Sequence, residues 1–124
     1  MSTRATYQFI GNITGTHTAY IHHDGYPEYA FNYIKGNNNI DSFITNNEKA
    51  EITESHDEHG DTEYRYTIQN DIVVCQKRNF DTDSFDIIFI GTIEQFVSKY
   101  EAEYKKLCKQ HEELYVNFDN RKGA

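Results

Sequence analysis

The sequence predicts an α+β fold, in which an antiparallel sheet of about five to six strands is covered on one face by a long C-terminal helix and a short helix after the second strand. Two observations lead to this prediction. Segments that alternate polar and apolar residues, or that are rich in β-branched residues, recur between residues 4 and 90. One long amphipathic segment then begins at residue 92. We find no internal repeat, and we expect a single α+β domain over residues 1–124.

The first two strands are predicted to pair as a hairpin. Residues 4–10 alternate polar and apolar side chains, and residues 16–22 form a second strand-like segment. Between them, residues 11–15 read Gly-Asn-Ile-Thr-Gly, which is typical of a turn. An antiparallel pair is therefore expected at the start of the chain.

A short helix is expected after the hairpin. An Asp-Gly turn precedes Pro27, whose φ angle is preset for the first position of a helix. Gly36 stands where the end of that helix favours a left-handed residue. The asparagines at 37–39 mark a loop, and a short helical or irregular piece follows around residues 40–46.

The middle of the chain predicts an antiparallel meander. Strands are expected at residues 50–55, 62–69, 72–77 and 85–90. The second of these alternates cleanly, with two tyrosines and an isoleucine on one side. The last two are rich in β-branched residues, a composition typical of strands that are buried on both faces.

The final helix has the clearest signals. Thr92 and Gln95 form a capping box, in which each side chain satisfies a backbone amide at the helix start. Apolar residues, with one histidine among them, then recur at spacings of three and four: Ile93, Phe96, Val97, Tyr100, Tyr104, Leu107, His111 and Leu114. This pattern predicts an amphipathic helix that packs on the sheet. Part of the same face equally suits a partner helix, so a homodimer is a second option.

Negative charge is concentrated in one segment. The formal net charge of the chain is −8, and residues 41–63 contain eight acidic residues and one basic residue. The acidic residues are Asp41, Glu48, Glu51, Glu54, Asp57, Glu58, Asp61 and Glu63. Direct binding to nucleic acid is disfavoured, because affinity for phosphates comes from Lys and Arg. The segment suits a basic surface of a host protein or nucleoprotein complex, or it serves solubility alone.

The composition also bears on location and on the cysteines. No run approaches the roughly 18 apolar residues of a membrane helix, and the first residues lack a signal peptide's apolar centre. We therefore expect a cytoplasmic protein without membrane association, in the host cell if a phage encodes it. Cys75 and Cys108 are expected to be reduced and mostly buried.

The segment from His22 to Tyr26 is the candidate ligand site. The predicted hairpin brings Arg4 back beside it, so that a guanidinium, imidazoles, a carboxylate and a phenol share one corner. The residues concerned are Arg4, His22, His23, Asp24 and Tyr26. Such a group suits a phosphate or carboxylate, and a small anionic molecule such as a nucleotide is the corresponding ligand. The alternative is a structural turn with an Arg4–Asp24 ion pair of little energetic value.

Few features point to an enzyme or a metal site. His56 and His59 stand three apart among carboxylates, but spacing fixes no third or fourth ligand. The aspartates of residues 81–86 do not complete a calcium-binding loop. No nucleophile elbow, phosphate-binding glycine loop or dinucleotide fingerprint occurs. We predict no catalytic residue, no metal and no cofactor; a small hydrolase using His23 and Asp24 is the third hypothesis.

Two short motifs carry a resemblance to a known group. The chain begins with MSTRAT, and residues 23–28 read HDGYPE. Over about the first 35 residues this resembles a group of small proteins of phages and mobile elements that share both motifs. The resemblance implies a phage or mobile-element origin and transfers no catalytic residues. By analogy with anti-CRISPR proteins, the leading prediction is a non-enzymatic protein that inhibits a host defence complex through its acidic segment.

Overall fold

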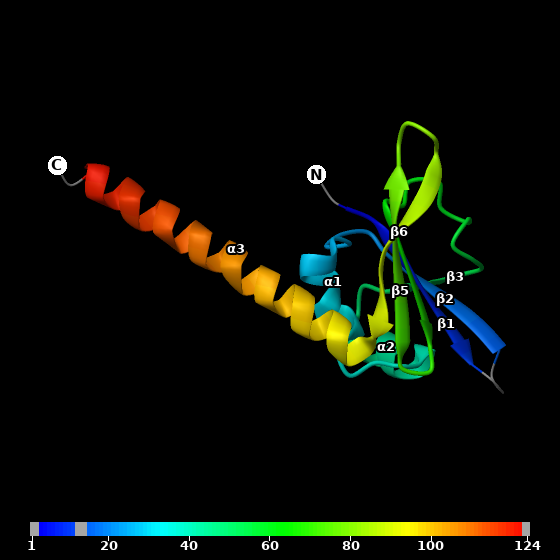
Figure 1. Cartoon of the computed structure of the whole chain (residues 1–124). Helices are drawn as coiled ribbons and strands as arrows, with labels where there is room; N and C mark the ends of the chain where they lie inside the picture. Colours follow the sequence, from blue (N-terminus) through cyan, green and yellow to red (C-terminus); the bar gives the residue numbers. More distant parts are fainter. Residues whose placement is uncertain (1–2, 12–14, 123–124) are drawn as a thin grey trace.

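The computed structural model describes residues 3–11 and 15–122 of the chain, with side chains as far as residue 112 (Figure 1). This part of the chain forms one six-stranded sheet and three helices, which confirms the predicted α+β fold. The strands are β1 (Ala5–Gly11), β2 (Gly15–Ile21), β3 (Glu51–Thr53), β4 (Tyr64–Gln69), β5 (Ile72–Asn79) and β6 (Ser84–Thr92). The helices are α1 (Pro27–Ile34), α2 (Ile40–Asn46) and α3 (Ile93–Lys122).

The sheet has the strand order β3-β2-β1-β4-β5-β6. β1 and β2 form the expected hairpin, in which Ala5 lies opposite Ile21 and Gly11 opposite Gly15. β4, β5 and β6 form an antiparallel meander as expected, but β3, which was expected to belong to it, pairs with β2 at the opposite edge of the sheet. The two antiparallel units meet where β1 pairs with β4, and that pair is parallel. The sheet is therefore mixed, because no tight turn fixes the relative direction of β1 and β4.

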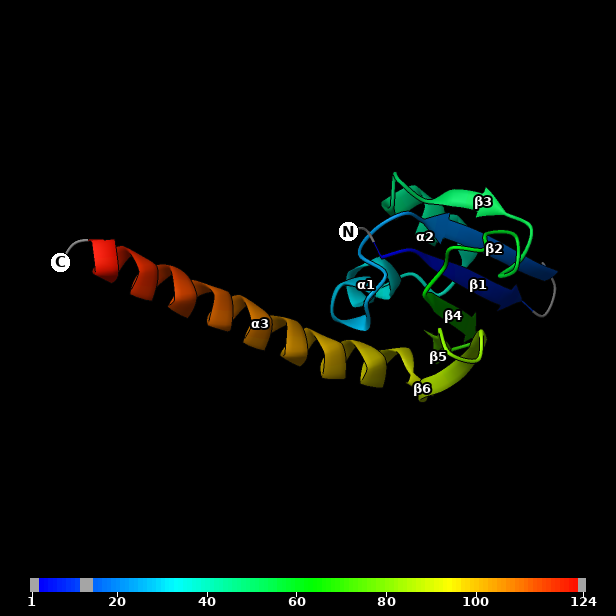
Figure 2. The ribbon, with the colours of Figure 1, turned by 90° about the horizontal axis from the view of Figure 1, so that it is seen from above.

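The helices lie on one face of the sheet, and the other face, which we call the open face, carries no helix (Figures 1 and 2). The core between the two layers contains the side chains of Tyr7, Phe9, Tyr66, Ile68, Val73, Phe31, Ile34, Phe43, Phe96 and Tyr100. The first turns of α3 pack on this core and on α1, and its later turns extend away from the sheet (Figure 2). Within the described part of the chain, no helix combines the length and the apolar character needed to cross a membrane.

The local signals at the helix ends are confirmed. The backbone N–H of Gln95 donates to Oγ1 of Thr92 at 3.0 Å, and the N–H of Thr92 donates to Oε1 of Gln95 at 2.9 Å. Gly36 follows α1 with a φ of +75°, in the left-handed region expected for it. Asn39 caps α2 by accepting a hydrogen bond from the N–H of Ser42 at 2.9 Å.

Two expectations about burial are wrong. β5 and β6 are not buried on both faces: Ile72 of β5 is exposed, and on the edge strand β6 the exposed residues are Ile87, Ile88 and Ile90. The reason is that the helices cover only one face of the sheet, and in the described part of the chain no further strand pairs with β6. Cys75 is buried as expected, but Cys108 is exposed because it lies beyond the turns of α3 that pack on the core.

Two stacked tyrosines in the core differ in the partners of their hydroxyl groups. The rings of Tyr7 and Tyr66 lie 4.9 Å apart and almost parallel, and both side chains are fully buried. Tyr66 donates a hydrogen bond to the carbonyl oxygen of Gly25 at 2.5 Å. The hydroxyl of Tyr7 has no partner among the described residues. Burial raises the pKa of both phenols, so neither ionises near neutral pH.

This difference predicts opposite outcomes for the same substitution at the two positions. We expect Tyr66→Phe to destabilise the fold by about 1 to 3 kcal/mol, because it leaves a buried carbonyl unsatisfied. Tyr7→Phe is expected to be neutral or stabilising, because it removes a buried hydroxyl that has no partner. Urea unfolding of the two variants beside the wild type measures both values. Equal losses of stability would show that the two hydroxyls are in equivalent environments, contrary to this prediction.

Candidate functional site

The His22–Tyr26 corner is where the chain passes from β2 into α1, and Gly25 lies at its centre. The N–H of Gly25 donates to the carbonyl oxygen of Thr3 at 3.0 Å, and its own carbonyl accepts the hydrogen bond of Tyr66. Asp24 has a φ of +57°, which is the left-handed conformation that Asp tolerates in turns. Tyr26 is extended and Pro27 begins the helix. The backbone of the corner is therefore an integral part of the core.

Three of the predicted ligand residues of the corner, Arg4, His22 and Asp24, each contact a residue outside the predicted site. Nε of Arg4 lies 3.1 Å from Oδ2 of Asp61, an ion pair without an aligned hydrogen bond. His22 lies 3.4 Å from the carboxylate of Glu51. Asp24 accepts a long hydrogen bond of 3.4 Å from Tyr33.

Tyr26 and His23, the other two predicted ligand residues, do not complete a shared binding site with Arg4, His22 and Asp24. The ring of Tyr26 packs edge-on against Tyr64, with the centroids 5.6 Å apart, and His23 is half-buried. The Arg4–Asp24 ion pair of the structural alternative is replaced by Arg4–Asp61. Ligand binding at this corner stays a prediction, and retention of a nucleotide that Arg4→Ala abolishes is its test.

His56 belongs to a segment that folds back over the open face of the sheet. Residues 54–63 connect β3 to β4 and cross this face (Figure 2). His56 bonds to a threonine on each of two strands, with Nδ1 2.7 Å from Oγ1 of Thr6 and Nε2 3.1 Å from Oγ1 of Thr67. Burial, and then the nearby Arg65, lower the pKa of His56 to about 4. A neutral ring suits this position, because one nitrogen donates and the other accepts.

His59 and two arginines attach the same segment to the sheet. The ring of His59 stacks on Tyr20 at 3.7 Å between centroids. Nη2 of Arg65 lies 2.6 Å from Oδ1 of Asp57, and Nη1 of Arg78 donates to the carbonyl oxygen of Gly60 at 2.7 Å. The two histidines thus take part in packing. Among the described residues, no group of three or more His, Cys, Asp or Glu side chains could hold a metal ion.

The seven predicted partner-binding residues form two sets of three and one separate residue. Asp57 and Asp61 lie in ion pairs with arginines, and Glu51 lies beside His22. Three others are exposed and take part in none of the ion pairs between described residues: Glu48, Glu54 and Glu58. The last member, Glu63, is half-buried, and its N–H donates to the carbonyl oxygen of Arg4 at 2.9 Å.

The seven predicted partner-binding residues belong to one continuous part of the chain around β3. They lie on β3, in the turn before it and in the segment that follows it, and we call this region the acidic surface: Glu48, Glu51, Glu54, Asp57, Glu58, Asp61 and Glu63. Asp41 is separate, because it lies in the first turn of α2 on the helical side of the sheet. The sequence located the acidic segment, but the ion pairs within it could not be read from spacing.

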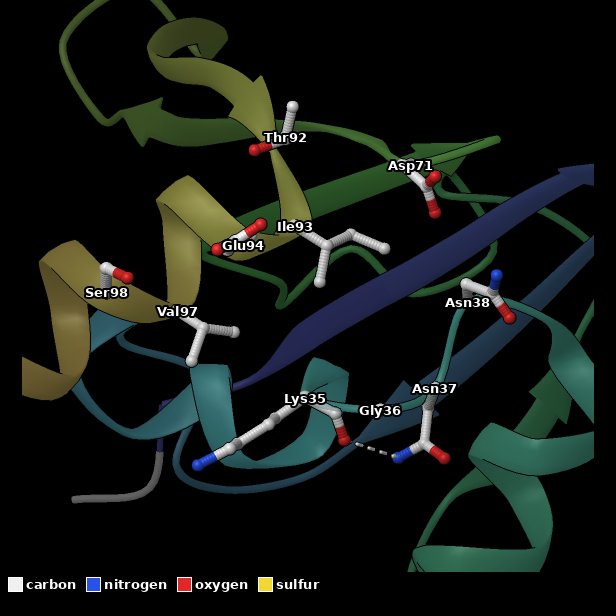
Figure 3. Close-up of a pocket in the computed structure, with 10 residues that line it drawn as sticks. All are labelled: Lys35, Gly36, Asn37, Asn38, Asp71, Thr92, Ile93, Glu94, Val97 and Ser98. Atoms are coloured by element: carbon white, nitrogen blue, oxygen red, sulfur yellow. Dashed lines mark hydrogen bonds between the residues drawn. The ribbon is translucent and has the colours of Figure 1, made fainter.

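A cleft of about 630 Å³ lies between the end of α1 and the start of α3, away from every residue of the predicted sites (Figure 3). The amide nitrogen of Asn37 donates to the carbonyl oxygens of Tyr33 and Lys35, and its oxygen accepts from Asn46 at 2.7 Å. None of the lining residues is a histidine or a cysteine. The lining does include the hydroxyl groups of Thr92 and Ser98 and the charged groups of Lys35, Asp71 and Glu94. Sequence reasoning missed the cleft because segments distant in the chain form it.

Comparison of the chain with known protein families, with characterised proteins and with solved structures gives no match. The resemblance to small phage proteins accordingly stays a prediction.

Proposed function

We propose that the protein is a non-enzymatic binding protein that presents its acidic surface to a basic surface of another protein. The observation that carries this proposal is the position of Glu48, Glu54 and Glu58. They are exposed, have no cationic partner among the described residues, and lie in or beside a segment attached to the sheet. Unpaired surface carboxylates of this kind attract a basic partner and accelerate its association.

The attachment of the segment matters for binding. Arg4, Arg65 and Arg78 each bind the segment, and His56 bridges β1 and β4. A segment held in this way loses little conformational entropy when a partner binds, and this favours affinity. The same contacts neutralise Asp57 and Asp61, so that the glutamates supply most of the attraction.

The reactive side chains are placed in ways that suit a binding protein. Burial raises the pKa of the Cys75 thiol to about 12, which disfavours the nucleophilic thiolate. His56 is held neutral between two threonine hydroxyls. These observations support the non-enzymatic part of the proposal.

The proposed class of partner is a host defence protein whose basic surface binds nucleic acid. The resemblance of the first 35 residues to small phage proteins supports this choice. The concentration of carboxylates supports it as well, because they repel nucleic acid and attract the protein surfaces that bind it. Such binding would block the host complex by occupying that surface.

Charge reversal on the acidic surface tests the proposal. The partner is first captured from a host lysate at low salt and identified, and its Kd is then measured. We expect the triple variant Glu48→Lys, Glu54→Lys and Glu58→Lys to weaken binding at least tenfold, which corresponds to about 1.4 kcal/mol. The salt dependence of binding should decrease with it. Asp57 and Asp61 stay unchanged, since their loss would release the segment.

The matched control carries the same change of charge elsewhere. Asp41→Lys, Asp81→Lys and Glu112→Lys replace three exposed acidic residues outside the acidic surface. This variant should retain most of the affinity. The proposal is wrong if the first variant binds as tightly as the wild type and with the same salt dependence, or if both variants lose affinity equally.

A further inference from the structure

The two edges of the sheet differ in length and in charge. β3, at one edge, has three residues, and Glu48, Glu51 and Glu54 lie on it or beside it. β6, at the other edge, has nine residues, of which only Asp86 is charged. Proteins prevent unwanted strand pairing with short, charged edge strands. β3 is protected in this way, whereas β6 offers a long ladder of backbone groups to another strand.

β6 also exposes apolar side chains. Ile87, Ile88 and Ile90 are 56%, 41% and 62% exposed. On the neighbouring β5, Ile72 is 43% exposed, and Val74 lies opposite Ile90. An apolar group of this kind beside an open edge is typical of an association surface.

We propose that β6 pairs antiparallel with β6 of a second copy of the chain, so that two sheets join into one. The outer edge of β6 is free for this pairing. After β6 the chain continues as α3 over the same face of the sheet as α1 and α2, and no described element lies beyond the edge of β6 (Figure 2). A twofold symmetric contact of a strand with itself uses the same edge in both copies and closes after two chains.

Among possible contacts between two copies of the chain, the charge distribution favours β6. Two copies with a net charge of −8 each repel, and the contact with the least repulsion is the one farthest from the acidic surface. β6 lies at the edge opposite β3, and Lys77 and Lys99 lie near it: Lys77 is opposite Asp86, and Lys99 lies over the rings of Phe89 and Tyr100. Pairing through β6 leaves both acidic surfaces at the outer ends of the joined sheet.

A bulge in β6 supplies a matching register. The pairs Cys75–Phe89 and Gln76–Ile87 leave Ile88 as an extra residue. As a result Ile87 and Ile90, three residues apart, lie opposite Gln76 and Val74, which share the open face. Antiparallel pairing of Ile87 with Ile90 of the second copy brings all four side chains into contact on that face, and Asp86 then lies opposite a glycine instead of another carboxylate.

Sedimentation equilibrium of the whole protein, from low to high micromolar concentration, tests the proposal. We expect the wild type to approach twice its chain mass of 14.6 kDa. The double variant Ile87→Lys and Ile90→Lys should sediment as a monomer, since four lysines would meet at the contact. Ile52→Lys is the matched control, because Ile52 is 65% exposed on the opposite edge strand, and it should leave the dimer intact. Circular dichroism and thermal unfolding confirm that each variant is folded.

A third variant distinguishes β6 from α3 as the dimer interface. Leu107 is exposed on α3 and belongs to the amphipathic stripe of that helix. If Leu107→Lys dissociates the dimer and the β6 variant does not, α3 is the interface and the proposal is wrong. It is also wrong if the wild type is a monomer at every concentration, or if Ile52→Lys abolishes the dimer. None of these results depends on the acidic surface, so the proposed function is tested separately.

Discussion

Replacing Gly25 with alanine is expected to lower the free energy of unfolding by about 3 kcal/mol or more. A Cβ at this position would lie 2.9 Å from the carbonyl oxygen of Thr3 and 3.0 Å from Cβ of Ala5. Ala5 is the first residue of β1 and Thr3 lies two residues before it, so both contacts are with a segment that is fixed by the sheet and cannot yield as a flexible side chain would. Any backbone shift would also weaken the buried hydrogen bond from Tyr66 to the carbonyl of Gly25.

Gly60→Ala is the matched control for this prediction. A Cβ at Gly60 meets no atom within 4 Å, and its backbone is outside the left-handed region. We expect a change within about 0.5 kcal/mol, as is usual for a surface substitution. Chemical denaturation measures the free energy of unfolding of both variants and of the wild type. If Gly25→Ala were as stable as Gly60→Ala, the corner would be pliable, and its close packing on β1 would not be needed for the fold.

His56 is expected to make the stability fall as the pH is lowered from 6.5 to about 4. The pKa of its ring is about 4 in the folded protein and 6.5 in an unperturbed chain. Above pH 6.5 the ring is neutral in both states, and the full stability is present. Between the two values the unfolded chain takes up a proton that the folded protein does not, so unfolding becomes easier. Below about pH 4 both states are protonated, and this contribution changes no further.

The expected loss over this range is about 2 to 3 kcal/mol, after allowance for the part of the ring that solvent reaches. Urea unfolding of the wild type and of His56→Gln at a series of pH values isolates the contribution of His56 to the free energy of unfolding. Glutamine can bond to both Thr6 and Thr67 without titrating, so the difference between the two proteins should change with pH in this window. A constant difference would show that His56 is not buried as a neutral ring.

The two proposed surfaces have a joint consequence. A dimer joined through β6 carries one acidic surface at each end of a continuous sheet. A partner with two basic sites at a matching separation would then bind both, and the second contact would be intramolecular. Disrupting β6 would in that case weaken binding to such a partner without any change in the acidic surface.

The sequence by itself determined the elements and some of their ends, although the bounds of β3, β4, β5 and β6 differ by one to two residues from those predicted. The hairpin of β1 and β2, the helix that begins at Pro27 and ends before Gly36, and the capping box of α3 all follow from residues close together in the chain. The alternation of β4 likewise assigned Tyr66 to the core. Periodicity, turn residues and caps are local properties, and local properties can be read from one sequence.

Only the tertiary structure decided how these elements meet. It set the parallel pairing of β1 with β4, the exposed edge of β6 and the partners of the charged side chains. Arg4 illustrates the reason, since its partner Asp61 lies far along the chain and arrives through a segment that crosses the open face. Such contacts depend on which surfaces long-range packing leaves free, and no spacing rule within one segment contains that information.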